Sequence, residues 1–168
     1  MIRYVKGVFL SALLIVTFSL HAEDLPYLNT VQQLEFGELM GFTGSCSLDY
    51  DSKILTDNGG SLCPFSGVRY GEPGKYLIVA NFNADVEVQI TSHTANGDGI
   101  LYTPSGIFRV HGEPDIPIIA DQKQTISSGT TGVITILLGG TLTLTANKAF
   151  DTTFTVTTEQ GIIFNEVD

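Results

Sequence analysis

Apolar and hydroxyl side chains alternate with a period of two along residues 133–145. Leucine or isoleucine occupies the even positions 134, 136, 138, 142 and 144, and threonine occupies most of the odd ones. Successive side chains of a strand point to opposite faces, so this pattern predicts a strand with one buried and one solvated face. Residues 86–90, 108–111 and 153–157 alternate in the same way, and helix signals are nearly absent. The chain is therefore predicted to be all-β.

Two glycines, Gly139 and Gly140, interrupt the longest alternating stretch. A two-residue hairpin at this point would set Leu138 opposite Thr141 and mix apolar and hydroxyl side chains on one face. A continuous strand keeps the alternation intact, so we expect a single strand that is kinked at the glycines. Such a kink would let the two halves serve different sheets or let another backbone approach closely.

Turn sequences rich in glycine, proline, asparagine and aspartate separate the alternating stretches. They lie at residues 57–60, 72–74, 96–99 and 113–115. Short antiparallel strands with a turn about every ten residues predict an antiparallel two-sheet sandwich of immunoglobulin type. Residues 28–40 are ambiguous, because Val31, Leu34 and Leu39 would line a helix whereas Leu34 and Phe36 fit a strand. We expect a strand from Leu34 onward.

The N-terminal residues have the pattern of a secretory signal peptide. Arg3 and Lys6 precede an apolar run of about 14 residues, shorter than the roughly 20 of a membrane-spanning helix, and His21-Ala22 ends in a small residue typical of a cleavage site. We therefore predict a signal peptide at 1–22, an N-terminal leader or donor-strand segment at 23–33 and one sandwich domain at 34–168. The protein is expected to be exported to the periplasm, the cell surface or the medium, with no stable membrane span.

Charge and cysteine content narrow the possible partners. The chain has 18 acidic and 8 basic residues and a formal net charge of −10, and its scattered cations do not suit a nucleic-acid backbone. Its two cysteines, Cys46 and Cys63, are predicted to form a disulfide in an oxidising compartment. Together with the distant His93 and His111 they lack the spacing of zinc ligands. No metal or cofactor is expected.

The carboxylates offer two sequence-close pairs, Asp49 with Asp51 and Glu113 with Asp115. Paired carboxylates can hydrolyse glycosidic bonds, and two acids on one strand face could form a weak calcium site. Both pairs are interpreted as solvated turn or edge residues, and neither a serine-hydrolase elbow nor a phosphate loop occurs. We therefore expect no catalytic residues, and the protein is predicted not to be an enzyme.

Aromatic residues can form a platform for sugar binding. The chain has no tryptophan, which leaves four tyrosines as candidates: Tyr50, Tyr70, Tyr76 and Tyr102. Tyrosines at the edges of sandwiches are commonly structural, because the ring packs while the hydroxyl reaches a partner. The sequence therefore gives sugar binding only minor support.

Several segments resemble a known family. They are Leu-Glu-Phe-Gly at 34–37, Val-Ala-Asn-Phe at 79–82 leading into 86–90, Ile-Leu-Leu-Gly-Gly-Thr-Leu at 136–142, and Thr-Phe-Thr-Val-Thr at 153–157. This arrangement resembles the bacterial domain of unknown function 4402, and its most specific motif is Gly139, Gly140, Thr141 and Leu142. Members are exported, and the pattern looks like that of pilin-type subunits assembled by a chaperone and an usher. The resemblance thus implies a pilin-like sandwich.

If the chain is pilin-like, the resemblance implies strand addition, in which the N-terminal segment of one subunit fills a groove in the next. Leu25, Tyr27, Asn29 and Val31 are the predicted donor-strand residues, although a plain first strand or a disordered leader also fits this segment. Residues 162–167 could themselves be the final strand, and a sandwich that is closed in this way needs no donor.

Two functions therefore follow from the sequence. The first is a non-catalytic structural or adhesion subunit of a bacterial surface or pilus-like assembly, such as a fimbrium. Its partners would be copies of itself or related subunits, and a periplasmic chaperone. The alternative is a self-complete monomeric binding module outside the cytoplasm, with an unknown ligand.

Overall fold

The computed structural model describes residues 24–63, 70–95, 99–147, 152–156 and 161–167 of the 168-residue chain. Its strands are β1 Tyr27–Gln32, β2 Leu34–Leu39, β3 Gly44–Leu48, β4 Leu55–Gly60, β5 Gly74–Val79, β6 Asp85–Ile90, β7 His93–Ala95, β8 Ile100–Val110, β9 Ile116–Pro117, β10 Lys123–Ser127, β11 Val133–Leu144, β12 Thr152–Val156 and β13 Ile162–Val167. A short 3-10 turn, Gly129–Thr131, precedes β11. All paired strands are antiparallel, so the all-β prediction is confirmed.

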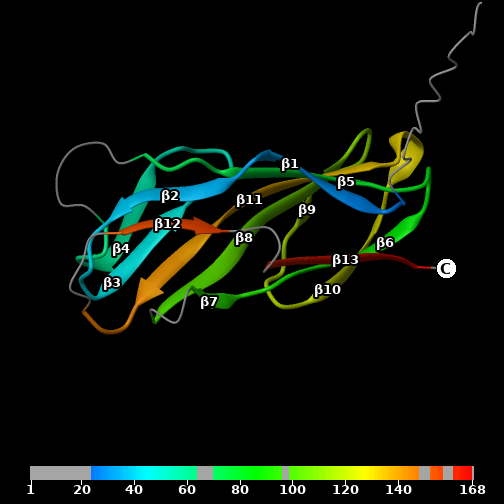
Figure 1. Cartoon of the computed structure of the whole chain (residues 1–168). Helices are drawn as coiled ribbons and strands as arrows, with labels where there is room; N and C mark the ends of the chain where they lie inside the picture. The colour runs from blue at the N-terminus through cyan, green and yellow to red at the C-terminus, as the bar shows by residue number, and fades with distance from the viewer. Residues whose placement is uncertain (1–23, 64–69, 96–98, 148–151, 157–160, 168) are drawn as a thin grey trace, which may run out of the picture.

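Strand β11 is the centre of the largest sheet (Figure 1). One of its edges pairs with β8 along nearly the whole strand, from Ile134 opposite Val110 to Leu144 opposite Ile100. Its other edge pairs with β5 over residues 133–138 and with β3 over residues 140–144. The predicted continuous strand is therefore confirmed. Its two halves serve different neighbouring strands of the same sheet.

The two glycines lie where β11 changes neighbours, and both are needed for close packing. A Cβ on Gly139 would lie 2.2 Å from the carbonyl oxygen of Leu48. Gly140 has a φ of 151°, and a Cβ there would lie 2.4 Å from the ring of Tyr102. Only glycine leaves room for such contacts. The expected close approach of another backbone is thus present at the two glycines.

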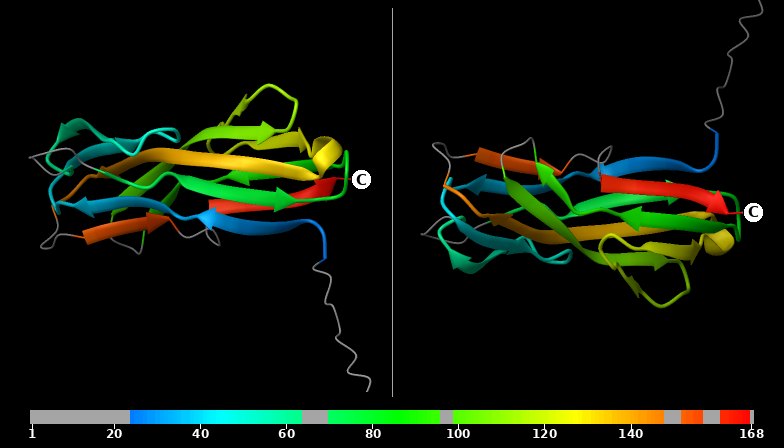
Figure 2. Two further views of the ribbon diagram at one scale, coloured as in Figure 1. Left: turned by 90° about the horizontal axis from the view of Figure 1, so that it is seen from above. Right: turned by 90° about the horizontal axis from the view of Figure 1, so that it is seen from below.

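The second layer consists of two small sheets, β10-β6-β13 and β12-β2. Val86, Val88 and Ile90 of β6 are at most 1% exposed and belong to the same buried cluster as the inward side chains of β5, β8 and β11. Phe36 of β2 meets Tyr102 of β8 edge to face, with ring centroids 6.2 Å apart. Figure 2 shows the elongated two-layer shape that results. Burial of these apolar faces is the main stabilising contribution.

Two buried tyrosines form hydrogen bonds through their hydroxyl groups, one between the two layers and one within the largest sheet. The backbone N–H of Leu34 in β2 donates to the Tyr76 hydroxyl of β5 at 2.9 Å. The Tyr102 hydroxyl donates to the carbonyl oxygen of Gly139 at 2.6 Å. Burial raises the pKa of both phenols, so both remain neutral. Buried tyrosine hydroxyls need such partners.

Residues 57–60 differ from the prediction, because they are not a turn but the continuation of β4. Ser45 and Gly44 of β3 lie opposite Gly59 and Gly60, next to a register shift. A Cβ on Gly60 would lie 2.4 Å from the Cα of Gly44. The glycines thus allow a bulge and close packing between β3 and β4. In the sequence, glycines in this role cannot be distinguished from turn residues. Residues 72–74 and 113–115 do connect strands, whereas 96–98 lie outside the described residues.

The N-terminal part of the domain is extended, and no helix forms over residues 28–40. Strand β2 begins at Leu34, as predicted, but β1 also joins the sandwich by pairing with β5. The strands thus begin at Tyr27, inside the stretch assigned to a leader. The predicted signal peptide lies outside the described residues. None of the helices in the described part of the chain is long and apolar enough to cross a bilayer.

Candidate functional site

Cys46 and Cys63 form the predicted disulfide. Cys46 lies in β3, Cys63 follows β4, and their Cα atoms are 5.5 Å apart. Both side chains are at most 1% exposed, and they are the only cysteines of the chain. The bond therefore belongs to the core and has a structural role. A disulfide-bonded pair is compatible with an exported protein.

The last strand, β13, pairs with the protein's own sheet. All six of its residues lie opposite β6, from Ile162 facing Ile90 to Val167 facing Asp85. Ile162 is buried and Phe164 is half-buried against the core. The side chain of Asn81, just after β5, donates to the Glu166 carboxylate at 3.0 Å. The C-terminal segment thus forms the edge of the second layer.

The predicted donor-strand residues lie at the edge of the first layer. Tyr27 and Asn29 are opposite Val79 and Leu77 of β5, Leu25 precedes the strand, and Val31 lies at a register shift. Leu25 and Val31 are exposed. Among the described residues, neither β1 nor β13 has a strand on its other edge, and both run along the same side of the sandwich (Figure 2). Each therefore presents a row of backbone donors and acceptors to solvent.

A surface hollow lies on the outer face of the largest sheet, beside the two glycines of β11. Its volume is about 300 Å³. The residues that line it are Ser47, Leu48, Asp49, Tyr50, Thr56, Ser105, Gly106 and Thr141. Thr141, part of the predicted family motif, is opposite Ser47 on β3 and Thr103 on β8, and Ser47 is opposite Thr56 on β4. Four neighbouring strands thus align their hydroxyl side chains in one row.

The turn after β3 forms one wall of the hollow. Strand β3 ends at Leu48, so Asp49, Tyr50 and Asp51 lie in this turn. The expectation that Asp49 and Asp51 share a strand face is therefore wrong. Asp49 and Tyr50 line the hollow and Asp51 does not. In the described part of the chain, no three His, Cys, Asp or Glu side chains gather as metal ligands.

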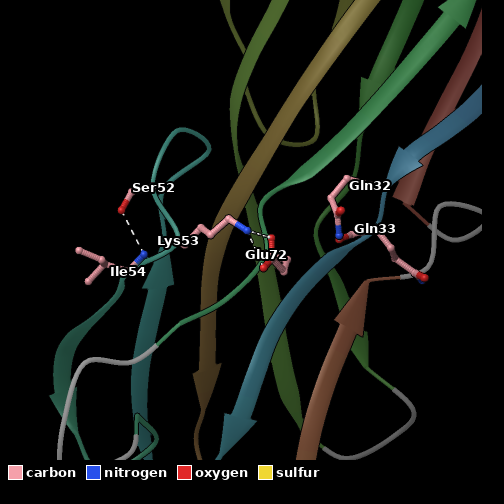
Figure 3. Close-up of polar contacts among 6 residues, drawn as sticks. All are labelled: Gln32, Gln33, Ser52, Lys53, Ile54 and Glu72. Atoms are coloured by element: carbon pink, nitrogen blue, oxygen red, sulfur yellow. Dashed lines mark hydrogen bonds and ion pairs between the residues drawn. The ribbon is translucent and has the colours of Figure 1, made fainter.

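Polar contacts hold this turn against the rest of the sandwich (Figure 3). The Lys53 ammonium binds both oxygens of Glu72, at 2.7 and 2.5 Å, and the Lys53 carbonyl accepts the backbone N–H of Gly71. Glu72 in turn exchanges two backbone hydrogen bonds with Glu35 of β2. The side chain of Ser52 accepts the N–H of Ile54. The segment that carries Tyr50 is thus anchored to β2 and to the start of β5.

The second carboxylate pair, Glu113 and Asp115, lies on the protein surface. Both oxygens of Asp115 accept hydrogen bonds from the Arg109 guanidinium, at 2.8 and 2.7 Å. These bonds hold the pKa of Asp115 below its ordinary value. An ionised carboxylate cannot act as a general acid. Glu113 lies exposed in the turn after β8.

The histidines and tyrosines lie in several different places. His93 of β7 packs on Tyr102, with ring centroids 5.2 Å apart, while His111 lies exposed in the turn after β8. Tyr76 and Tyr102 are buried in the core, and Tyr70 is exposed away from the hollow. Tyr50 is the only one of the four candidate tyrosines that lines the hollow. The sequence named it as a candidate but offered no signal for its neighbours on β8 and β11.

Comparisons with known proteins identify no relative. No family model matches the chain, and neither a curated protein nor a solved structure is found to match it. The pilin-like resemblance of the sequence therefore stays a prediction.

Proposed function

We propose that this protein is a self-complete, non-catalytic binding module that acts outside the cytoplasm. The observation that carries the proposal is the pairing of β13 with β6 along all six residues. A pilin-type subunit would lack this strand and depend on a donor from its neighbour. Here Val86, Val88 and Ile90 are buried without any partner chain.

Two further observations support the proposal. The buried disulfide of Cys46 and Cys63 suits an oxidising compartment. Among the described residues, the carboxylates that could act in catalysis are dispersed, and Asp115 is held by Arg109. Binding requires only a shaped and rigid surface, which a two-layer sandwich supplies through its strands and loops.

Removal of β13 tests the proposal. The full-length mature protein, purified without a chaperone, should elute as a sharp monomer in size exclusion with light scattering. A chain that ends at Gly161 should aggregate, because its β6 edge and the core beneath become exposed. A synthetic peptide of residues 162–167 should restore the monomer, whereas a scrambled peptide should not. Heat-stable ladders of the full-length protein would contradict a self-complete module.

The structural or adhesion subunit remains the second candidate function, and the open edges of β1 and β13 favour it. Both lie on one side of the molecule, and Ile163 and Val167 of β13 are 55% and 44% exposed. An exposed edge with apolar side chains can accept a strand from another copy. In a polymerising protein, Ile163→Lys should shorten the polymers. In a monomeric module, it should leave the elution volume unchanged.

A further inference from the structure

We propose that the hollow beside Tyr50 binds a neutral saccharide of one or two rings. The inference rests on the proposed binding function and names its ligand class. The volume of about 300 Å³ lies at the lower end of the range of ligand pockets, roughly 300–1,000 Å³. A hollow of this size suits the end of a glycan rather than an extended saccharide chain.

Hydroxyl groups from four strands form the floor and sides. Thr56, Ser47, Thr141 and Ser105 belong to β4, β3, β11 and β8. A hydroxyl group has one donor and two acceptor sites, so each can serve a sugar hydroxyl in either direction while keeping a protein partner. The hydroxyl oxygens of Ser47 and Thr141 are hydrogen-bonded to each other at 2.8 Å. This bond leaves further hydrogen-bonding sites on both oxygens. This chemistry matches a ligand that carries many hydroxyl groups and no charge.

Tyr50 supplies the apolar surface that such a site needs. Tyr50 is half-buried and lines the hollow from the turn after β3. An aromatic face can cover the C–H groups of a sugar ring, while hydroxyl groups around it fix the orientation. The beginning of this turn packs against Gly139, where any side chain would collide with Leu48, Asp49 and Tyr50. The close contact at Gly139 thus holds the start of the turn that carries Tyr50 against β11.

Charge excludes acidic ligands from the hollow. Among the described residues that line the hollow, Asp49 is the one with a charged side chain, and the protein as a whole has a formal charge of −10. A sugar that carries a carboxylate, sulfate or phosphate would be repelled. The nearby cation of β8, Arg109, is paired with Asp115. The Asp49 carboxylate can accept strong hydrogen bonds from neutral sugar hydroxyls.

The hollow is also preorganised. Its hydroxyl groups lie on paired strands, and the side chain of Asn58 donates to Ser47. The wall is anchored through Lys53 and Glu72. A rigid site loses less conformational entropy on binding, which raises affinity for a small ligand.

The test is a titration of the intact mature protein by two-dimensional NMR. The probes are the methyl glycosides of glucose, galactose, mannose and N-acetylglucosamine, with sialic acid as the acidic comparison. We expect at least one neutral glycoside to shift the amide signals of Ser47, Ser105, Gly106 and Thr141, with a dissociation constant of about 1 mM, typical of a small site with few contacts.

Variants of Tyr50 decide whether the ring is responsible. Tyr50→Ala should weaken binding about tenfold, and Tyr50→Phe should stay within about threefold, because the ring persists. The matched control is Tyr70→Ala, which removes an exposed tyrosine outside the hollow and should bind like the unaltered protein. Unchanged binding by Tyr50→Ala would overturn the inference.

Two other results would also overturn it. One is the absence of amide shifts with every neutral probe, and the other is sialic acid binding as well as the neutral glycosides. Light scattering on the same sample separates this inference from the proposed function. A monomer that binds no neutral glycoside refutes only the ligand class, whereas a polymer refutes the self-complete module.

Discussion

Replacing Gly139 with alanine tests how close packing at this glycine of β11 shapes both the core and the hollow. The new Cβ would lie 2.2 Å from the Leu48 carbonyl oxygen, 2.9 Å from the Tyr50 nitrogen and 3.0 Å from the Asp49 carbonyl carbon. The closest of these contacts falls short of ordinary van der Waals contact at 3.4 Å by about 1.2 Å. All three atoms belong to the backbone, so no side-chain rotation can relieve the collision.

The expected loss of stability follows from this geometry. Overpacking against a well-ordered backbone costs about 3 kcal/mol, and the reduced entropy of the unfolded alanine chain returns only about 0.4–1 kcal/mol. The net loss should be about 2–3 kcal/mol, which lowers the melting temperature of a domain of this size by about 5–10 °C. Because residues 48–50 must shift, saccharide binding in the hollow should weaken as well.

Gly112 provides a matched control, because its φ is 84° but a Cβ there meets nothing within 4 Å. Gly112→Ala should cost only the conformational strain, about 1–2 kcal/mol, and leave the hollow unchanged. Urea unfolding followed by circular dichroism would measure both variants. The reasoning is refuted if Gly139→Ala is as stable as the unaltered protein, or if it retains the amide shifts of the hollow.

Three further predictions concern stability. The native protein should react with no thiol reagent until it is reduced, and free thiol in the native protein would contradict the disulfide. The double variant Cys46→Ala, Cys63→Ala should be about 3 kcal/mol less stable in urea, because the disulfide joins residues with a sequence separation of 17. Tyr102→Phe removes the 2.6 Å hydrogen bond to the Gly139 carbonyl and should cost about 1–3 kcal/mol in the same assay, and a smaller loss would show that water or another group replaces the hydroxyl. Hydrogen bonds from the Ser92 side chain and backbone lower the pKa of Asp121 below its ordinary 3.8, so its contribution to stability is complete above that pH and is lost as the pH falls through the lower folded value. Asp121→Asn should therefore be less stable than the unaltered protein at pH 6, and the two stabilities should converge below the folded pKa of Asp121. A stability difference that is independent of pH would refute the assignment.

Much of the fold could be predicted from residue patterns alone. Alternation identified β6, the end of β8 and the whole of β11, because burial of one sheet face imposes a period of two on each strand. The pairing of Cys46 with Cys63 followed from a count of two cysteines. The same local reasoning misassigned residues 57–60, since glycine and asparagine serve a bulged strand edge as well as a turn.

The candidate sites could not be predicted in this way, because they depend on residues distant in sequence. Tyr50 was visible as an aromatic candidate, but its position beside Ser105 and Thr141 depends on the order of β3, β11 and β8 in the sheet. The sequence indicated that residues 162–167 could be a final strand, but it did not show that this strand would pair with β6. Periodicity reports which face of a strand is buried, but only the packing of the whole chain determines which strand lies beside it. Long-range pairing therefore decides whether an edge stays open and where a hollow forms.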